Sequence, residues 1–440
     1  VLYRCLFVFS FIFPCFTYSS QTSQDLHNLA LESCPCSVIE NCVSVISGEY
    51  FELDVDASLN TGEPLSFSRN YSSIQKKPWL YQEESSLKVF TSGKKITSID
   101  FYDSSGVKIS FNQGSEEEGF TVKELDLKGS TNCFSGTLSG QNNLKNLKIL
   151  PIKDEDKGEI TLLYGNGCKK VFDGKFPLKV DRRTGFSQHL IKETLPSLSY
   201  LKYTYDEENR LIKKSLKSKD GKLCLGWIEI IYGSFGRSSF VVKTSDNHRF
   251  SINSINSPKA KSMIKDELLI ESVVGKRVHD IQYSYRYDAC FDVPKLRKKN
   301  FGEGRFLEID YYSKGSHDVA GRKIQVGQLQ LGKVKALKSS RNGSKEGVVT
   351  HEFIYEKDLT IVIDANKHET KYHYEDGVLK KLEYFEWNES SQDQSFIRRE
   401  EFTFGDSKGE FPGCLIKKET FDENQKLWES QEFSYDSRGN

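Results

Sequence analysis

Apolar and polar residues alternate along most of this chain with a period of two. Residues 281–287 read Ile-Gln-Tyr-Ser-Tyr-Arg-Tyr, and residues 307–311 read Leu-Glu-Ile-Asp-Tyr. A period of two places successive side chains on opposite faces of a β-strand. Aromatic and β-branched residues favour such a half-buried pleated surface. The pattern therefore predicts strands with one face in a core and the other face in water.

Turn signals separate the expected strands, for example Glu207-Glu208-Asn209, Asp220-Gly221 and Asp376-Gly377. Such residues tolerate a positive φ or hydrogen-bond to their own backbone, so they suit tight hairpins. Only ten prolines occur in 440 residues, and long ladders can run without interruption. We predict an all-β fold from residue 43 onward, an array of antiparallel β-hairpin repeats. The one early helix that we expect is two turns over residues 25–33.

Aromatic residues close many of these strands at a recurring spacing. Several of the intervals between them are roughly 20–30 residues, and such a period is typical of a solenoid, a propeller or a strand array. Each unit of such an array buries its aromatic face only by packing on its neighbours. The residues are Tyr205, Tyr232, Tyr287, Tyr312, Tyr355, Tyr374, Phe404 and Tyr435.

The first 19 residues resemble an export signal. Arg4 precedes an apolar stretch from Cys5 to Phe16, and small residues follow it. This stretch is shorter than the about 20 residues that span a bilayer, but it fits the apolar region of a signal peptide. A short buried strand or helix at the start of the protein is the alternative. We expect residues 1–19 to be a signal peptide, no transmembrane segment after it, and an exported protein that is periplasmic, at the cell surface or secreted.

Charge argues against nucleic acid as a partner. The chain has 62 Lys and Arg and 62 Asp and Glu, so its formal net charge is zero. Residues 20–75 are acidic, with Arg69 as the one basic residue before Lys76. The compensating positive charge is spread as single lysines along expected strands. We interpret those lysines as solvated strand faces.

Export would place the cysteines in an oxidising compartment. Eight remain after the expected signal, and an even number permits disulfides in any of 105 pairings. A zinc site on the cluster near residue 36 would need His27 as its fourth ligand and is the weaker alternative; free or intermolecular thiols are another. The disulfide candidates are Cys34, Cys36, Cys42, Cys133, Cys168, Cys224, Cys290 and Cys414.

The sequence contains no recognisable catalytic arrangement. The chain lacks H-E-x-x-H, and His368 and His373 lie five positions apart, on opposite faces of an expected strand. The segment 136–140, Gly-Thr-Leu-Ser-Gly, has the wrong spacing for a nucleophile elbow. We therefore expect no enzymatic activity, no cofactor, no metal ligand and no catalytic residue.

One motif recurs in the second half of the chain. Residues 203–212 read YTYDEENRLI, residues 372–379 read YHYEDGVL, and residues 433–440 read FSYDSRGN. These segments resemble the tyrosine–aspartate (YD) repeat of bacterial RHS (rearrangement hot spot) proteins. Residues 363–370 resemble the lead-in of that repeat, with Lys367 where the family usually has Gly, and residues 43–50 and 64–73 resemble the segment that opens the array. The motif positions are Tyr203, Tyr205, Asp206, Tyr372, Tyr374, Gly377, Tyr435, Asp436 and Gly439.

The resemblance implies a β-sheet shell, which in many members of the family encloses a C-terminal toxin. Because the chain stops within a repeat, we expect it to be the N-terminal part of a longer protein or the product of a decayed gene. Its partners would then be further repeats or a C-terminal effector. The expected layout is a signal peptide at 1–19, an acidic segment with cysteines at 20–42, a β-rich region at 43–199 and a degenerate repeat array at 200–440.

Two functions follow from these observations. The first is an exported structural and interaction protein that forms part of a shell or a cell-surface scaffold. The alternative is a carbohydrate- or envelope-binding module, in which Tyr384, Trp387 and Trp428 would stack on the sugar rings of cell-envelope glycans.

Overall fold

The computed structural model describes most of the chain after residue 36. The described residues are 37–74, 78–81, 85–92, 95–102, 108–114, 119–126, 147–150, 159–164, 167–174, 186–233, 236–255, 269–275, 278–340, 346–375, 378–405 and 415–434. The expected signal peptide, the expected helix at 25–33 and residues 20–36 of the acidic segment 20–42 lie outside them.

The prediction of an all-β, antiparallel fold is confirmed: the described residues form strands β1 to β32 and no α-helix. The predicted alternation is also present, because Tyr283 and Tyr285 are buried and Ser284 between them is exposed. No helix in the described ranges has the length and apolar character needed to cross a membrane.

Eight strands, β6 to β13, close into a ring. Each pairs antiparallel with the next, and the first half of β13 pairs back onto β6, with Phe186 opposite Val89. Its interior is apolar, and the buried rings of Phe101 on β7 and Phe172 on β12 lie 6.1 Å apart in it. The strands are β6 (Ser86–Ser92), β7 (Lys95–Tyr102), β8 (Lys108–Gln113), β9 (Phe120–Asp126), β10 (Lys148–Ile149), β11 (Ile160–Leu163), β12 (Lys169–Phe172) and β13 (Phe186–Thr194).

The second half of β13 pairs with β14, and there the ring continues into a long antiparallel sheet that we call the wall. The expected boundary at residues 199 and 200 lies in the turn between these two paired strands. The wall consists of β14 (Tyr200–Tyr205), β15 (Leu211–Lys217), β16 (Cys224–Gly233), β17 (Gly236–Thr244), β18 (Arg249–Ser254), β19 (Ile270–Gly275), β20 (Val278–Arg286), β21 (Lys295–Asn300), β22 (Phe306–Tyr311), β25 (Val334–Ser340), β26 (Val348–Glu356), β27 (Leu359–Asp364), β28 (Glu369–Glu375), β29 (Val378–Asn388), β30 (Asp393–Phe404), β31 (Leu415–Phe421) and β32 (Leu427–Glu432).

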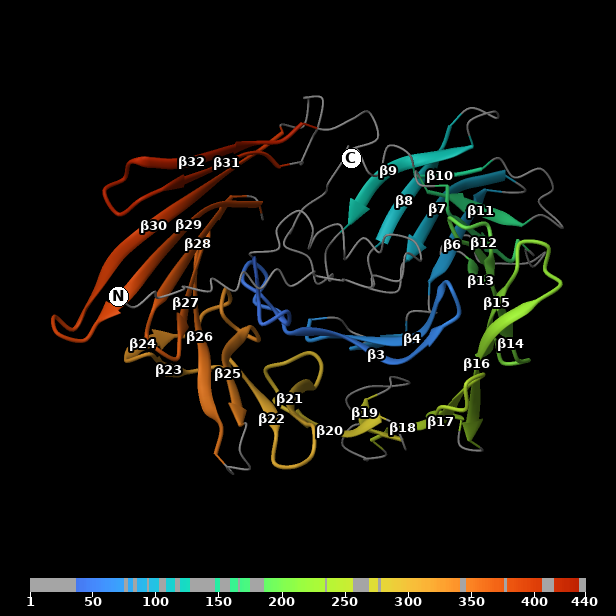
Figure 1. Ribbon diagram of the computed structural model, residues 1–440, viewed down its shortest axis with the longest axis horizontal. Helices are drawn as coiled ribbons and strands as arrows, with labels where there is room; N and C mark the ends of the chain where they lie inside the picture. Colours follow the sequence, from blue (N-terminus) through green and yellow to red (C-terminus); the bar gives the residue numbers. More distant parts are fainter. Residues whose placement is uncertain are drawn as a thin grey trace, which may run out of the picture.

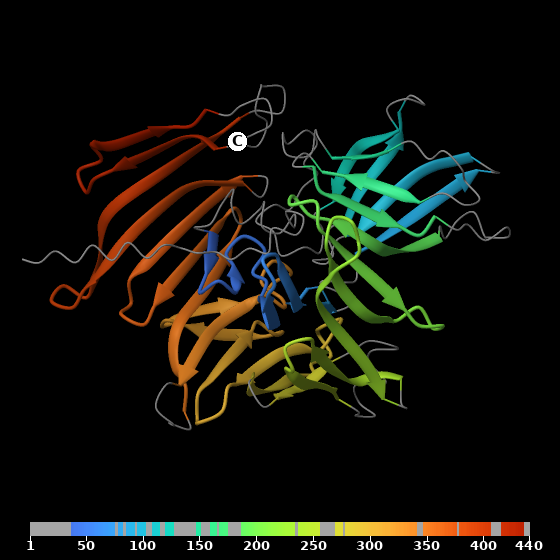
Figure 2. The same cartoon turned by 45° about the vertical axis from the view of Figure 1, so that its right-hand side comes forward.

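The N-terminal strands lie inside the curve of the wall. Figures 1 and 2 show the wall bending from the ring around β3 and β4, which occupy the centre of the molecule. The strands β3, β4 and β5 form a separate antiparallel sheet that we call the inner sheet. The remaining strands are β1 (Val38–Ile39), β2 (Val43–Ser44), β3 (Phe51–Asn60), β4 (Pro64–Ser72), β5 (Trp79–Tyr81), and the hairpin of β23 (Ser316–Val319) and β24 (Arg322–Gln325).

The wall reuses one turn at several hairpins. Asp206 accepts hydrogen bonds from the backbone N–H groups two and four residues later, and Asp364 and Asp422 do the same in their own hairpins. The fourth residue of each turn has a positive φ, 57° at Asn209 and 65° at Lys367. That backbone conformation suits Gly best, and this chain has Asn or Lys at these two positions.

Candidate functional site: a buried network between the inner sheet and the wall

The first strand of the inner sheet reverses the usual alternation. Along β3, Glu52, Asp54 and Asp56 point toward the wall, and Leu53 and Val55 between them are 49% and 57% exposed. A strand that packs on an apolar core would place its aliphatic residues on the packed face. Here that face carries carboxylates, and positive charge must therefore be buried beside them.

Arg69 of β4 supplies part of that charge from within the inner sheet. Its side chain is fully buried and binds Asp56 through Nε and, at 2.8 Å, through Nη2. The same Nη2 donates to Asp54 Oδ2 at 3.2 Å. The guanidinium lies 5.0 Å from the ring centre of Trp79 and 5.5 Å from that of Tyr283. Burial alone would lower the pKa of Arg69, but the charge of Asp56 raises it above its usual value.

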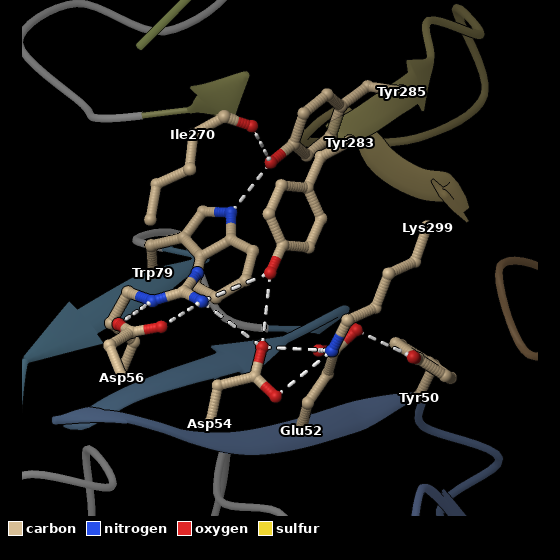
Figure 3. A network of polar contacts seen from close by, with 10 residues as sticks. Tyr50, Glu52, Asp54, Asp56, Trp79, Ile270, Tyr283, Tyr285 and Lys299 are labelled. Atoms are coloured by element: carbon tan, nitrogen blue, oxygen red, sulfur yellow. Dashed lines mark hydrogen bonds and ion pairs between the residues drawn. The ribbon is translucent and has the colours of Figure 1, made fainter. Parts of the chain in front are cut away.

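Lys299 on β21 supplies the charge from the wall. Its Nζ lies 2.5 Å from Glu52 Oε2 and 3.0 and 2.9 Å from the two carboxyl oxygens of Asp54. Tyr50 donates to the other oxygen of Glu52 at 2.6 Å, and Tyr283 donates to Asp54 Oδ2 at 3.1 Å. Figure 3 shows these groups converging from the inner sheet and the wall. We call Glu52, Asp54, Asp56, Arg69, Tyr283 and Lys299 the buried network.

The pKa values follow from this arrangement. Burial raises the pKa of Glu52 against the charge of Lys299. Burial would also raise the pKa of Asp54, but Lys299 and Arg69 together lower it. Burial of a charge is costly unless it is paired and hydrogen-bonded. These opposite charges and their hydroxyl donors meet that condition, so the network holds the inner sheet in one position.

Neutral contacts continue the same interface. Trp79 Nε1 donates to Tyr285 Oη at 2.7 Å, and Tyr285 donates in turn to the backbone oxygen of Ile270 at 2.7 Å. The backbone N–H of Leu296 donates to Tyr71 Oη at 2.7 Å. Aromatic side chains of the inner sheet are therefore tied to β20 and β21 directly, and to β19 through Tyr285.

Two further lysines bind the backbone of the inner sheet. Lys214 donates to the oxygen of Ser66 at 3.2 Å, and Lys295 donates to the oxygen of Ser73 at 2.6 Å. Lys214, Lys295 and Lys299 are buried, and our interpretation of the scattered lysines as solvated strand faces is wrong for these three. Their partners come from a segment more than 140 positions away, which local charge patterns do not reveal.

The loop before β3 docks on the opposite half of the wall. Val334 N donates to the oxygen of Gly48 at 2.8 Å, and Thr360 Oγ1 donates to the oxygen of Val45 at 2.6 Å. Gly48 has a φ of +72°, and a β-carbon there would lie 2.5–2.7 Å from side-chain carbons of Lys333. The backbone of the loop at Gly48 therefore packs directly against the side chain of Lys333.

Glu49 lies at the centre of this docked loop. Its side chain is fully buried, binds the hydroxyl of Ser72, and has one oxygen for which the described part of the chain offers no hydrogen-bond donor. Burial raises the pKa of Glu49 to about 8, against the effects of Ser72 and Lys295.

The structure does not test the disulfide prediction as a whole. The thiols of Cys42, Cys224 and Cys290 are free, and Cys168 is buried. The candidates Cys34, Cys36, Cys133 and Cys414 lie outside the described residues, so the pairing stays a prediction. Within the described ranges, no three His, Cys, Asp or Glu side chains converge as metal ligands would.

The motif tyrosines contribute to the wall rather than to a binding site. Tyr203 is buried and donates to Glu193 at 3.0 Å, and Tyr205 donates to the oxygen of Leu190 at 2.7 Å. Tyr372 is buried and Tyr374 half-buried. Gly377, Tyr435, Asp436 and Gly439 lie outside the described residues.

Two of the three aromatic residues proposed for sugar stacking lie against a cation, and the third is exposed. Arg398 lies 4.4 Å from the ring centre of Tyr384, and Lys367 lies 5.1 Å from that of Trp387. Trp428 on β32 is 73% exposed.

Sequence reasoning did not identify the residues of the buried network. Carboxylates at three alternate positions, 52, 54 and 56, in a segment whose one basic residue is Arg69, are the signal that it could have used. No local sequence feature distinguishes the partners Tyr283 and Lys299, because both lie in strands with an ordinary half-buried pattern.

No protein-family model and no curated protein matches this chain. Among solved structures it is similar to a TcdB2-TccC3-Cdc42 structure at 10% identity and a TM-score of 0.33, over 88% of this chain and 19% of the other. A Photorhabdus luminescens Tc holotoxin pore matches at 10% identity and a TM-score of 0.23, over 89% and 23%. The N-terminal domain of the effector SpvB from Salmonella typhimurium matches at 10% identity and 0.19, over 87% and 100%. This chain thus spans less than a quarter of the Tc chains, and similarities at these values do not establish a shared function.

Proposed function

We propose that the chain is an exported structural and interaction protein. In this proposal it is an RHS-like strand array that forms part of a shell or a cell-surface scaffold, and it has no catalytic activity of its own. Further repeats or a C-terminal effector would be its partners. The observation that carries the proposal is the enclosure of the inner sheet by the wall, with Arg69 and Lys299 buried at the contact.

Several features support this role. The wall presents tyrosine hydroxyls, lysine amines and backbone groups that hold another stretch of polypeptide along its inner side. Antiparallel hairpins with the same Asp turn extend it strand by strand. Such an array encloses polypeptide by adding repeats, and it needs no reactive group to do so.

Native-state hydrogen exchange tests the enclosure. If the wall holds the inner sheet, the amides of residues 51–72 should exchange only when the wall strands β19–β22 open as well. Exchange of residues 51–72 in minutes, while β19–β22 stay protected, would show that the inner sheet is only loosely attached and would contradict the proposal.

Fractionation tests export. Cells that express the chain with its first 19 residues should place it outside the cytoplasm, and N-terminal sequencing of the product should begin near Ser20. A cytoplasmic product that retains Val1 would remove the export part of the proposal.

Trp428 is the most exposed of the three aromatic residues proposed for sugar stacking, so the glycan-binding alternative rests on this residue. Binding of envelope glycans on an array, abolished by Trp428→Ala and retained in Trp387→Ala, would favour that function over a scaffold alone. No selective binding by the unaltered chain would rule it out.

A further inference from the structure

The side chains of Lys299, Glu52 and Asp54 are arranged in a way that suits a reaction between them as well as an ion pair. The amine of Lys299 lies 3.0 and 2.9 Å from the two oxygens of the Asp54 carboxyl group, which places it close to the carboxyl carbon that these oxygens flank. Reacting groups held at about 3–3.5 Å are in the range of a near-attack geometry. Figure 3 shows the amine between the two carboxyl groups.

The two carboxyl groups are held differently. Asp54 Oδ2 accepts hydrogen bonds from Arg69 Nη2 at 3.2 Å and from Tyr283 Oη at 3.1 Å. A positive and a neutral donor on one oxygen would stabilise negative charge that develops there, as an oxyanion hole does. Glu52 accepts a hydrogen bond from the hydroxyl of Tyr50, and its Oε2 lies 2.5 Å from Lys299 Nζ. Glu52 is thus placed to exchange protons with the amine, and Asp54 is placed to be attacked.

Water has little access to this group. The side chains of Lys299 and Glu52 are 8% and 7% exposed, and that of Asp54 is 23% exposed. The rings of Tyr283 and Phe301 lie 5.8 and 5.3 Å from the amine. Burial alone disfavours the ionised forms of an amine and an acid, but the opposite charges outweigh it here, raising the pKa of Lys299 and lowering that of Asp54. The partly exposed Asp54 leaves a path by which a small product can leave.

We propose that Lys299 and Asp54 form an intramolecular isopeptide bond, with Glu52 as the proton-transfer group. The bond would covalently join the inner sheet to strand β21 of the wall.

The reaction is a condensation and needs no co-reactant. Lys299 passes one ammonium proton to Glu52, and the lone pair of the neutral amine attacks the carboxyl carbon of Asp54. Negative charge gathers on Oδ2, where Arg69 and Tyr283 donate. The bond from the carbon to Oδ1 then breaks, and Oδ1 leaves as water with the proton from Glu52 and a second proton from the amine. The third proton stays on the amide nitrogen, and no group is oxidised or reduced.

The protonation states of the amine and of Glu52 limit the rate of this condensation. Burial would lower the pKa of Lys299, but Glu52 and Asp54 raise it above its usual value, so the neutral amine is scarce. Burial raises the pKa of Glu52, which favours its protonated form. The bond should therefore form slowly after folding, in a single turnover for each molecule.

Intact-mass measurement of the purified chain tests the proposal directly. After prolonged incubation of the folded protein, its mass should fall below that of the sequence by the mass of one water molecule. Tryptic digestion should then yield one branched peptide that contains both Asp54 and Lys299, because trypsin does not cleave after an acylated lysine. A mass equal to that of the sequence, with normal cleavage after Lys299, would overturn the proposal, and so would an amide to Glu52 in place of Asp54.

Variants assign the roles. Lys299→Arg and Asp54→Ala should both retain the full sequence mass, and Glu52→Gln should slow the loss of water at least tenfold while circular dichroism still reports a folded sheet. Lys214→Arg is the matched control, because Lys214 is equally buried but donates to a backbone oxygen; it should lose water as the unaltered chain does. Water loss at an unchanged rate in Glu52→Gln would overturn the role of Glu52.

Discussion

The indole N–H of Trp79 lies 2.7 Å from the hydroxyl oxygen of Tyr285, although 206 positions separate the two residues along the chain. Trp79 is 1% exposed, and its ring packs on Tyr71 and Tyr283 at centroid distances of 5.1 and 5.2 Å. One side chain of the inner sheet thus connects to the wall through both a polar and an aromatic contact.

Replacing Trp79 should separate these two contributions. Trp79→Ala removes a buried ring and should lower the free energy of unfolding by about 3–5 kcal/mol. Trp79→Phe keeps most of the apolar contact, loses the N–H donor, and should cost about 1–2 kcal/mol. Urea titration followed by far-UV circular dichroism measures both. Trp428→Ala, at an exposed position, is the control and should stay within about 0.5 kcal/mol; a similar loss there would mean that burial at Trp79 is not the cause.

Gly48 and Gly62 give a matched pair for the docked loop. Both have a positive φ, +72° and +80°, but a β-carbon meets Lys333 at Gly48 and nothing within 4 Å at Gly62. Gly62→Ala should cost about 1–2 kcal/mol from the backbone alone, and Gly48→Ala should cost about 2–4 kcal/mol because overpacking adds to it.

The double variant Gly48→Ala, Lys333→Ala tests the cause. Removing the Lys333 side chain makes room for the new methyl group, so the double variant should be less destabilised than the sum of its single variants. Strict additivity in thermal unfolding would show that the two positions do not touch.

The sequence was sufficient for the fold class and for many hairpins. Alternation such as that of residues 281–287 depends only on the period of a strand, and turns such as that at Asp206 depend on local hydrogen bonds. Both are short-range properties, which is why the pattern of the wall could be predicted.

The inner sheet could not be predicted in the same way. Its position depends on pairs such as Lys299 with Glu52, which are 247 positions apart. The acidic character of residues 20–75 was visible in the sequence, but the wall partner of Glu52 and Asp54 is the buried Lys299, which occupies an ordinary polar position of a half-buried strand. The closure of the ring between β6 and β13 also joins residues far apart in the sequence.

Asp364 tests the shared turn of the wall. It accepts from the backbone N–H groups of Asn366 at 2.8 Å and His368 at 2.9 Å. Asp364→Ala removes both bonds and should lower stability by about 1–2 kcal/mol. Asp364→Asn retains a side-chain acceptor and should keep most of that stability. Equal losses in chemical denaturation of the two variants would show that the carboxylate charge, rather than the hydrogen bonds, stabilises the turn.

Glu49 should make the stability of the protein depend on pH. Burial raises its pKa from 4.5 to about 8, so between these values the folded chain holds a proton that the unfolded chain has released. The stabilisation is fully present below pH 4.5 and is lost as pH rises toward 8, and the loss should be on the order of 3–5 kcal/mol. Lys295, the neighbouring cation, has a lowered pKa of about 8 and acts in the opposite direction only above that value.

Unfolding at a series of pH values between 5 and 8 should therefore show a steeper fall in the free energy of unfolding for the unaltered chain than for Glu49→Gln. Glu40→Gln, which changes an exposed carboxyl group, should retain the steep fall. If Glu49→Gln keeps the same pH dependence as the unaltered chain, the proton is bound elsewhere and the docked loop does not respond to pH.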